Sequence, residues 1–95
     1  MATVTVKTLF TLAHVLGDQR ELTISLSEKT RVKDALAILL ERFGKPFEEE
    51  LLDGDSLKNG ITIFVNGVTA EALDGLDTLL KDQDTLLIMP PVGGG

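Results

Sequence analysis

The residue types best suited to chemistry lie at the carboxyl end of the chain, in residues 89–95 (MPPVGGG). Glycine has no side chain, so an extended glycine tail can enter a channel that is too narrow for any other residue. The α-carboxylate of Gly95 is the one group that such a tail can present deep inside the active site of a partner. A carboxylate is a poor electrophile until it is activated, for example as a mixed anhydride with AMP. The carboxylate of Gly95, reached through Pro90, Pro91, Val92, Gly93 and Gly94, is therefore a candidate for such activation, with an inert tail as the alternative.

The remaining residues offer few other catalytic or metal-binding groups. The chain has no cysteine, which excludes a thiolate nucleophile, a disulfide framework and a zinc site built on cysteine. The single histidine, His14, has apolar neighbours, where a structural role is more common than that of a base or ligand. Asp53-Gly54-Asp55 lacks the later ligands of a calcium loop, so we interpret it as a turn and expect no metal site. Residues 48–50 (EEE) are interpreted as a solvated acidic face, with docking of a basic partner as the alternative.

Composition and charge limit the class of protein. The 95 residues are 43% hydrophobic and 25% charged, which is typical of one small globular domain. Nine basic against fifteen acidic residues give a net charge of −6, a sign that repels nucleic acids and anionic membranes and favours a positively charged protein partner. The longest apolar run is far below the roughly 20 residues of a membrane span, and the N-terminus lacks the pattern of a signal peptide. We therefore expect a cytoplasmic protein with no nucleic-acid or membrane partner.

Four segments have the alternation of a strand. Residues 3–10 and 21–27 alternate apolar and polar side chains and are expected to pair in an antiparallel manner. Residues 61–66 (ITIFVN) and 85–89 (TLLIM) predict two more strands. The pair Asn66-Gly67, which tolerates a positive φ, predicts a tight turn directly after the third strand.

One helical stripe gives the clearest pattern in the chain. Apolar residues at helical spacing predict a main helix over about residues 31–43, with Thr30 as its N-cap. Gly44 is expected to end this helix and Pro46 to prevent it from resuming. Residues 47–52 can form a short second helix. The stripe consists of Val32, Ala35, Leu36, Leu39, Leu40 and Phe43.

These elements predict an α+β roll, in which a mixed four- or five-stranded sheet carries the main helix on one face. The first and last strands are expected to lie side by side at the centre of the sheet. We find no internal repeat and no second domain in the sequence. Residues 1–89 then form the domain, and residues 90–95 form a flexible C-terminal tail.

The face of the sheet without the helix is predicted to carry a docking patch. Apolar residues occupy both faces of the last strand, and alternation along residues 61–65 places Phe64 on the face away from the core. We predict that Phe64, with Leu86 and Ile88 of the last strand, forms an apolar surface that a partner covers. The alternative is that residues 68–80 fold over this face.

Taken together, these features resemble the ubiquitin-like (β-grasp) sulfur carriers of the MoaD/ThiS family. The strand order, Val65-Asn66-Gly67 after the third long strand, and the ending Pro90-Pro91-Val92 before a terminal Gly94-Gly95 carry the resemblance, which covers essentially the whole chain. The MoaD-type small subunit of molybdopterin synthase is the most similar type. By composition alone such a tail is more often inert, and the resemblance instead implies that it has a function.

The resemblance implies a carrier cycle and a set of partners. An E1-like adenylyltransferase of MoeB type, using ATP and Mg²⁺, adenylates the carboxylate of Gly95. A separate sulfur donor then replaces AMP and leaves a thiocarboxylate. The MoaE-type large subunit of molybdopterin synthase takes up the tail and transfers the sulfur to a pterin precursor of the molybdenum cofactor. The carrier itself binds no cofactor and is a co-substrate, not an enzyme on its own.

Two other functions remain open at the level of the sequence. Sulfur carriers for cysteine synthesis or tRNA thiolation, and ubiquitin-like protein modifiers, share the same kind of tail. A non-covalent β-grasp binding module with an inert tail is the third possibility.

Overall fold

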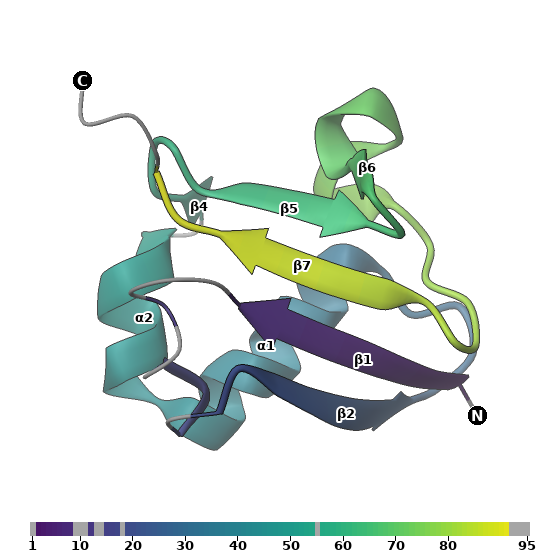
Figure 1. The fold of residues 1–95 in the computed structure, drawn as a ribbon, viewed down its shortest axis with the longest axis horizontal. Coiled ribbons are helices and arrows are strands. Elements are labelled where there is room, and N and C mark those ends of the chain that lie inside the picture. Colours follow the sequence, from purple (N-terminus) through teal and green to yellow (C-terminus); the bar gives the residue numbers. More distant parts are fainter. Residues whose placement is uncertain (1, 9–11, 13–14, 18, 55, 92–95) are drawn as a thin grey trace.

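Five strands form one mixed sheet in the computed structural model, which describes residues 2–8, 12, 15–17, 19–54 and 56–91. The predicted α+β fold is confirmed, with five strands in the sheet and the first and last strands paired at its centre (Figure 1). The order across the sheet is β2 (Glu21–Leu26), β1 (Ala2–Thr8), β7 (Thr85–Met89), β5 (Thr62–Val65) and β6 (Val68–Thr69). Only the β1–β7 pair is parallel among the pairings of this sheet, and the others are antiparallel.

Two helices and a small hairpin accompany the sheet. The main helix, α1 (Val32–Phe43), lies behind the strands in Figure 1, so that view looks onto the opposite face of the sheet. A second helix, α2 (Lys45–Leu51), leads into the two-residue strands β3 (Leu52–Asp53) and β4 (Ser56–Leu57). Two short 3₁₀ helices, η2 (Ala70–Ala72) and η3 (Gly75–Asp77), lie in the connection between β6 and β7.

The start of α1 differs by one residue from the prediction. Arg31, not Thr30, is the N-cap, and its backbone N–H donates to Oδ2 of Asp34 at 2.9 Å. The Thr30 hydroxyl instead donates to the carbonyl of Ser27 at 2.6 Å, so it closes the turn before the helix. A carboxylate three residues after the N-cap satisfies one of the free donors at a helix start, which explains why the helix begins at this register.

The prediction that Pro46 prevents the helix from resuming is wrong. Gly44 ends α1, with its N–H bonded to the carbonyl of Leu40 at 2.8 Å, and α2 begins at the next residue. Pro46 lies in the first turn of α2, where a backbone N–H has no partner within the helix and its loss costs little. The predicted second helix thus forms, and it buries Phe47 and Leu51.

The core lies between α1 and one face of the sheet. The stripe of α1 is confirmed, because Val32, Ala35, Leu36 and Leu39 are buried. Every second residue of β1 and β2 faces the helix, as the alternation predicts. The prediction for β1 extends to residue 10, but residues 9–11 lie outside the described part of the chain. The sheet contributes Val4, Val6, Leu22, Ile24, Leu26, Ile63, Val65, Leu86 and Ile88 to this core.

The predicted Asn66-Gly67 turn joins β5 to β6 and also fixes the start of β7. Both residues have positive φ, 52° and 84°. The Asn66 side chain accepts from the Thr85 N–H at 2.9 Å and donates to Oδ1 of Asp84 at 2.8 Å. A turn residue with a carboxamide therefore ties two strands together that are adjacent in space and distant in sequence.

We expect Leu39→Ala to lower the free energy of unfolding by about 2–5 kcal/mol, because it leaves a cavity under the sheet at a fully buried position. Ile38→Ala is the control on the same helix, since Ile38 is 39% exposed, and it should cost less than about 1 kcal/mol. Urea unfolding followed by circular dichroism measures both values. Equal losses in the two variants would show that the helix register is wrong.

Candidate docking face and tail exit

The face of the sheet opposite α1 carries a partly exposed apolar group at its centre. Phe64 of β5 pairs directly with Leu87 of β7, and Met89 pairs with Thr62. Side chains of paired residues lie on the same face of a sheet, and none of these four is fully buried. We call Phe64, Leu87 and Met89 the open-face patch. The neighbouring strand β1 places polar residues beside the patch, and Lys7 pairs with Leu87.

Two of the three predicted docking residues do not belong to this face. Leu86 and Ile88 are completely buried, because they pair with Val65 and Ile63 and point toward α1. Phe64 is placed as predicted, and the open-face partners from β7 are Leu87 and Met89. Alternation correctly separated the residues of β7 into two sets, but it did not say which set faces the helix. The registry of β7 with β5 decides this.

The connection between β5 and β7 does not cover the open-face patch. The N–H of Val32 donates to the carbonyl of Thr78 at 2.9 Å, and the N–H of Leu80 donates to the carbonyl of Thr30 at 2.8 Å. These bonds hold the connection beside the start of α1, and Ala70 is part of the core on that side. The alternative in which residues 68–80 fold over the patch is therefore wrong.

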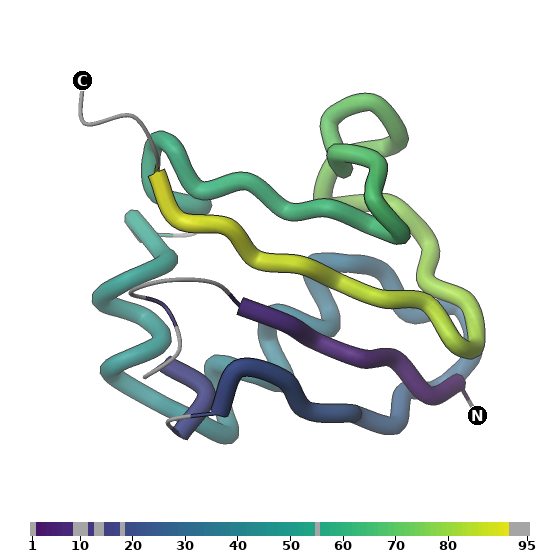
Figure 2. The backbone as a smooth tube through the Cα atoms, in the orientation of Figure 1, coloured from purple at the N-terminus to yellow at the C-terminus, as the bar shows by residue number. Residues whose placement is uncertain are grey.

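The described chain leaves the sheet at the same end as Met89. Pro90 is buried, and Pro91 is exposed and lies against Gly60, which precedes β5. Figure 2 shows the yellow end of the described chain beside the turn that leads into β5. Val92, Gly93, Gly94 and Gly95, and also His14 and Asp55, lie outside the described residues. Gly60 was not recognised as a site residue, and its only signal in the sequence is the Asn59-Gly60 turn pair.

Within the part of the chain that the structure describes, two carboxylates have a lowered pKa, and both lie at the other end of the sheet. Nζ of Lys33 is 3.0 Å from Oδ1 of Asp77, and this hydrogen bond, with the charge of Lys33, lowers the pKa of Asp77. The Thr3 N–H donates to Oδ1 of Asp82 at 2.8 Å, which lowers the pKa of Asp82. A general acid or base needs a pKa near the working pH. These carboxylates are therefore structural partners of backbone and lysine groups.

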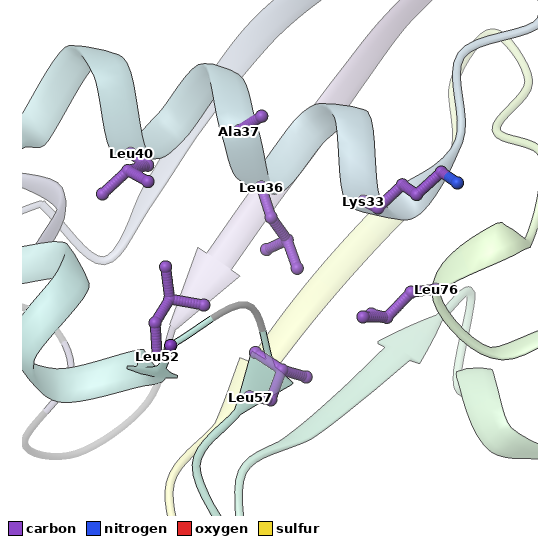
Figure 3. A pocket seen from close by; sticks show the side chains of 8 residues that line it. Lys33, Leu36, Ala37, Leu40, Leu52, Leu57 and Leu76 are labelled. Carbon is purple, nitrogen blue, oxygen red and sulfur yellow. The ribbon is translucent and has the colours of Figure 1, made fainter.

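The helix side of the molecule has an apolar cavity of about 190 Å³ between α1, the β3–β4 hairpin and η3 (Figure 3). Its leucines come from four elements and point toward one another, and Lys33 lies at its rim. Leu36, Leu40, Leu52, Leu57 and Leu76 are the leucines that line it. The lining offers apolar contacts and the ammonium group of Lys33, which is already paired with Asp77. It provides no nucleophile for a reaction.

The described residues offer neither a metal centre nor a membrane-spanning helix. They contain no group of three or more His, Cys, Asp or Glu side chains that could hold a metal ion. No helix within this part of the chain has the length and apolar character needed to cross a membrane.

Comparison with known proteins decides the family. The ThiS family matches residues 12–95, which is most of the chain. This chain belongs to the ThiS family. The resemblance to sulfur carriers of MoaD/ThiS type is thereby confirmed at the level of the family.

Relatives of this ThiS-family chain include carriers and modifiers. An Archaeoglobus fulgidus protein described as "Putative sulfur carrier protein" is 36% identical over 69 residues, which are 73% of this chain and 78% of that protein. The solution structure of small archaeal modifier protein 1 from Methanosarcina acetivorans has a TM-score of 0.82 and 37% identity, covering 100% of this chain and 98% of that one. A Pyrococcus furiosus structure described as "Putative molybdopterin converting factor, subunit 1" has a TM-score of 0.72 and 32% identity, covering 97% and 100%.

The assignment of the two faces of β7 can be tested with neighbouring leucines. Leu86→Ala removes a fully buried side chain and should lower the free energy of unfolding by about 2–5 kcal/mol. Leu87→Ala changes the partly exposed open-face patch and should cost much less. Thermal and urea unfolding of both variants provide the measurement. A larger loss for Leu87→Ala would reverse the assignment of the faces.

Proposed function

We propose that this ThiS-family chain is a sulfur carrier for molybdopterin synthesis, which presents the C-terminal carboxylate of Gly95 to an activating enzyme and then to the large subunit of molybdopterin synthase. One observation carries the proposal: the open-face patch extends from the centre of the sheet to the end where the tail leaves, since Met89 belongs to the patch and is the last residue of β7, and Pro91 follows two residues later. A partner that covers the patch is then next to the start of the tail. The family match and the Pyrococcus furiosus relative support the carrier role and the pathway, respectively.

The proposed cycle uses partners for every chemical step. An oxygen of the Gly95 carboxylate attacks the α-phosphorus of ATP in the Mg²⁺-dependent activating enzyme, and pyrophosphate leaves. A sulfur at the sulfide level, delivered by the donor, then attacks the acyl carbon and displaces AMP, which gives the thiocarboxylate. In the large synthase subunit this sulfur forms its bond to the pterin precursor, and water attacks the acyl carbon, breaks the carbon–sulfur bond and returns the carboxylate. The carrier contributes the docking face, the direction of the tail and its small cross-section.

A second candidate function is protein modification, favoured by the small archaeal modifier among the structural relatives. In that role a lysine amine of another protein attacks the acyl carbon of the Gly95 adenylate, an isopeptide bond forms and AMP leaves. The two functions share activation by an E1-like enzyme. They differ in the product, because a carrier ends as a free thiocarboxylate and a modifier ends as a conjugate.

Intact mass spectrometry of the protein from its own host tests the carrier function. After incubation with the activating enzyme, ATP and a sulfur donor, we expect a mass increase equal to the replacement of one oxygen by sulfur. A Gly95 deletion and a one-residue extension should both abolish the increase with unchanged circular dichroism, because neither changes a core residue. An unchanged mass with the cognate enzyme present and ATP unconsumed would overturn the proposal. Conjugates to lysines without a thiocarboxylate would favour the modifier.

The docking role of the open-face patch has its own test. Phe64→Ala should weaken binding to the activating enzyme about tenfold or more, or roughly 1.4 kcal/mol, because a central aromatic contact is lost. Ile38→Ala, on the exposed side of α1, should bind like the wild type. Isothermal titration calorimetry gives the affinities, and the melting temperature of Phe64→Ala should change little. Unchanged affinity would remove Phe64 from the interface, and a large drop in melting temperature would place it in the core.

A further inference from the structure

The turn before β5 contains a glycine, Gly60, that lies in close contact with Pro91 at the start of the tail. Gly60 has a φ of 89°, and the turn is closed by a hydrogen bond from the Ile61 N–H to the carbonyl of Lys58 at 3.2 Å. A Cβ atom placed on Gly60 would be 2.8 Å from Cβ of Pro91 and 2.9 Å from its Cγ. Carbon atoms that are not bonded to each other do not lie so close, so one of the two residues would have to move. Position 60 therefore requires glycine both for its backbone conformation and for the space that Pro91 occupies.

Neither Gly60 nor Pro91 can move away from this contact at a low cost in free energy. The pyrrolidine ring fixes φ of Pro91, so its carbons cannot rotate away as the end of a flexible side chain would. The residue before it, Pro90, is buried, and Met89 is paired with Thr62 just beyond the turn. Both partners of the contact are thus held by the sheet, and a larger residue at position 60 must displace the chain at Pro91.

Gly60 differs in this respect from the other glycines that have a positive φ. An added Cβ would meet nothing within 4 Å at Gly44, Gly54, Gly67 or Gly75. Gly67 is the closest match, because it also follows an asparagine in a turn and has a φ of 84°. Substitution of either residue by alanine strains the backbone in a similar way. Only substitution of Gly60 also pushes against the tail.

We infer that Gly60 is a positioning residue for the tail: Pro91 rests on it, and this contact sets the direction in which residues 92–95 leave the domain. The inference rests on the proposed function, in which Gly95 must reach the active site of a partner. Four extended residues span about 13 Å, so a tilt of roughly 20° at Pro91 moves the end by about 4–5 Å. A misdirected tail must be reoriented in each encounter, which weakens productive binding more than the chemical step. Gly60 does not touch the reacting carboxylate.

The test compares Gly60→Ala with Gly67→Ala as substrates of the activating enzyme. Pyrophosphate release is measured while the carrier concentration is varied. We expect Gly60→Ala to raise KM about tenfold and to change kcat by less than about twofold, and Gly67→Ala to leave both near the wild-type values. Equal KM values for the two variants, or a loss confined to kcat, would overturn the inference.

A double variant and a spectroscopic measurement separate positioning from instability. Pro91→Gly removes the ring carbons that an alanine at position 60 would meet, so adding Gly60→Ala to Pro91→Gly should raise KM no further. An additional tenfold rise in the double variant would contradict the contact. Amide chemical shifts of Gly93, Gly94 and Gly95 in the isolated protein should move in Gly60→Ala and stay unchanged in Gly67→Ala. Unmoved shifts in both would overturn the inference.

The two proposals fail in distinguishable ways. If the activating enzyme does not adenylate the wild-type protein, the proposed function is wrong, and the amide shifts alone decide whether Gly60 directs the tail. If the wild type is adenylated and Gly60→Ala has the same KM, the carrier function stands and the positioning role is wrong.

Discussion

The parallel pairing of β1 with β7 is the interaction on which the rest of the structure depends. It joins the two ends of the chain, with Val6 opposite Leu86 and Thr8 opposite Ile88. Both partners of each pair face α1, so the pairing and the burial of the core form together. Such a contact has a large loop-closure cost, which the buried apolar residues of the intervening chain must offset. The last strand is thereby held on both sides, by β1 and by β5.

A central last strand has a direct consequence for the tail. The residues after Met89 start from a strand that is paired on both sides, and not from a frayed end of the domain, where chain termini usually lie. The next two residues are also held in place by the domain, because Pro90 is buried and Pro91 packs against Gly60. The domain therefore defines the position and direction of the chain up to residue 91. In the proposed function, the residues beyond it supply only length and the carboxylate that the activating enzyme uses.

The same strand presents apolar side chains on both of its faces, and only one face lies under a helix. Leu86 and Ile88 complete the core, whereas Leu87 and Met89 remain partly exposed beside Phe64. Antiparallel sheets commonly have a polar second face, so the apolar residues at the centre of this one support the proposal that a partner docks here. In the proposed function, the place of these residues beside the tail exit connects recognition of the domain with delivery of the terminus. The acidic excess of the chain favours a partner with basic residues around that contact.

The sequence by itself determined the elements and most of the core. Periodicity of two or 3.6 residues is a local property, so the strands, the stripe of α1 and the Asn66-Gly67 turn could be read from neighbouring residues. Motifs at the carboxyl end likewise indicated the family before any contact was known. The predicted start of α1 differs by one residue, because Thr30 is a favoured N-cap residue type and the sequence does not show that its hydroxyl bonds to Ser27 while Asp34 accepts from the Arg31 N–H.

Only the tertiary structure decided which face each residue of β7 occupies and what the tail touches. A shift of one residue in registry exchanges the two faces of a strand, and registry depends on a partner strand distant in the sequence. For this reason Leu86 and Ile88 were assigned to the docking surface, where Leu87 and Met89 lie. The contact between Gly60 and Pro91 was invisible for the same reason, because it joins residues that become neighbours only when β5 pairs with β7.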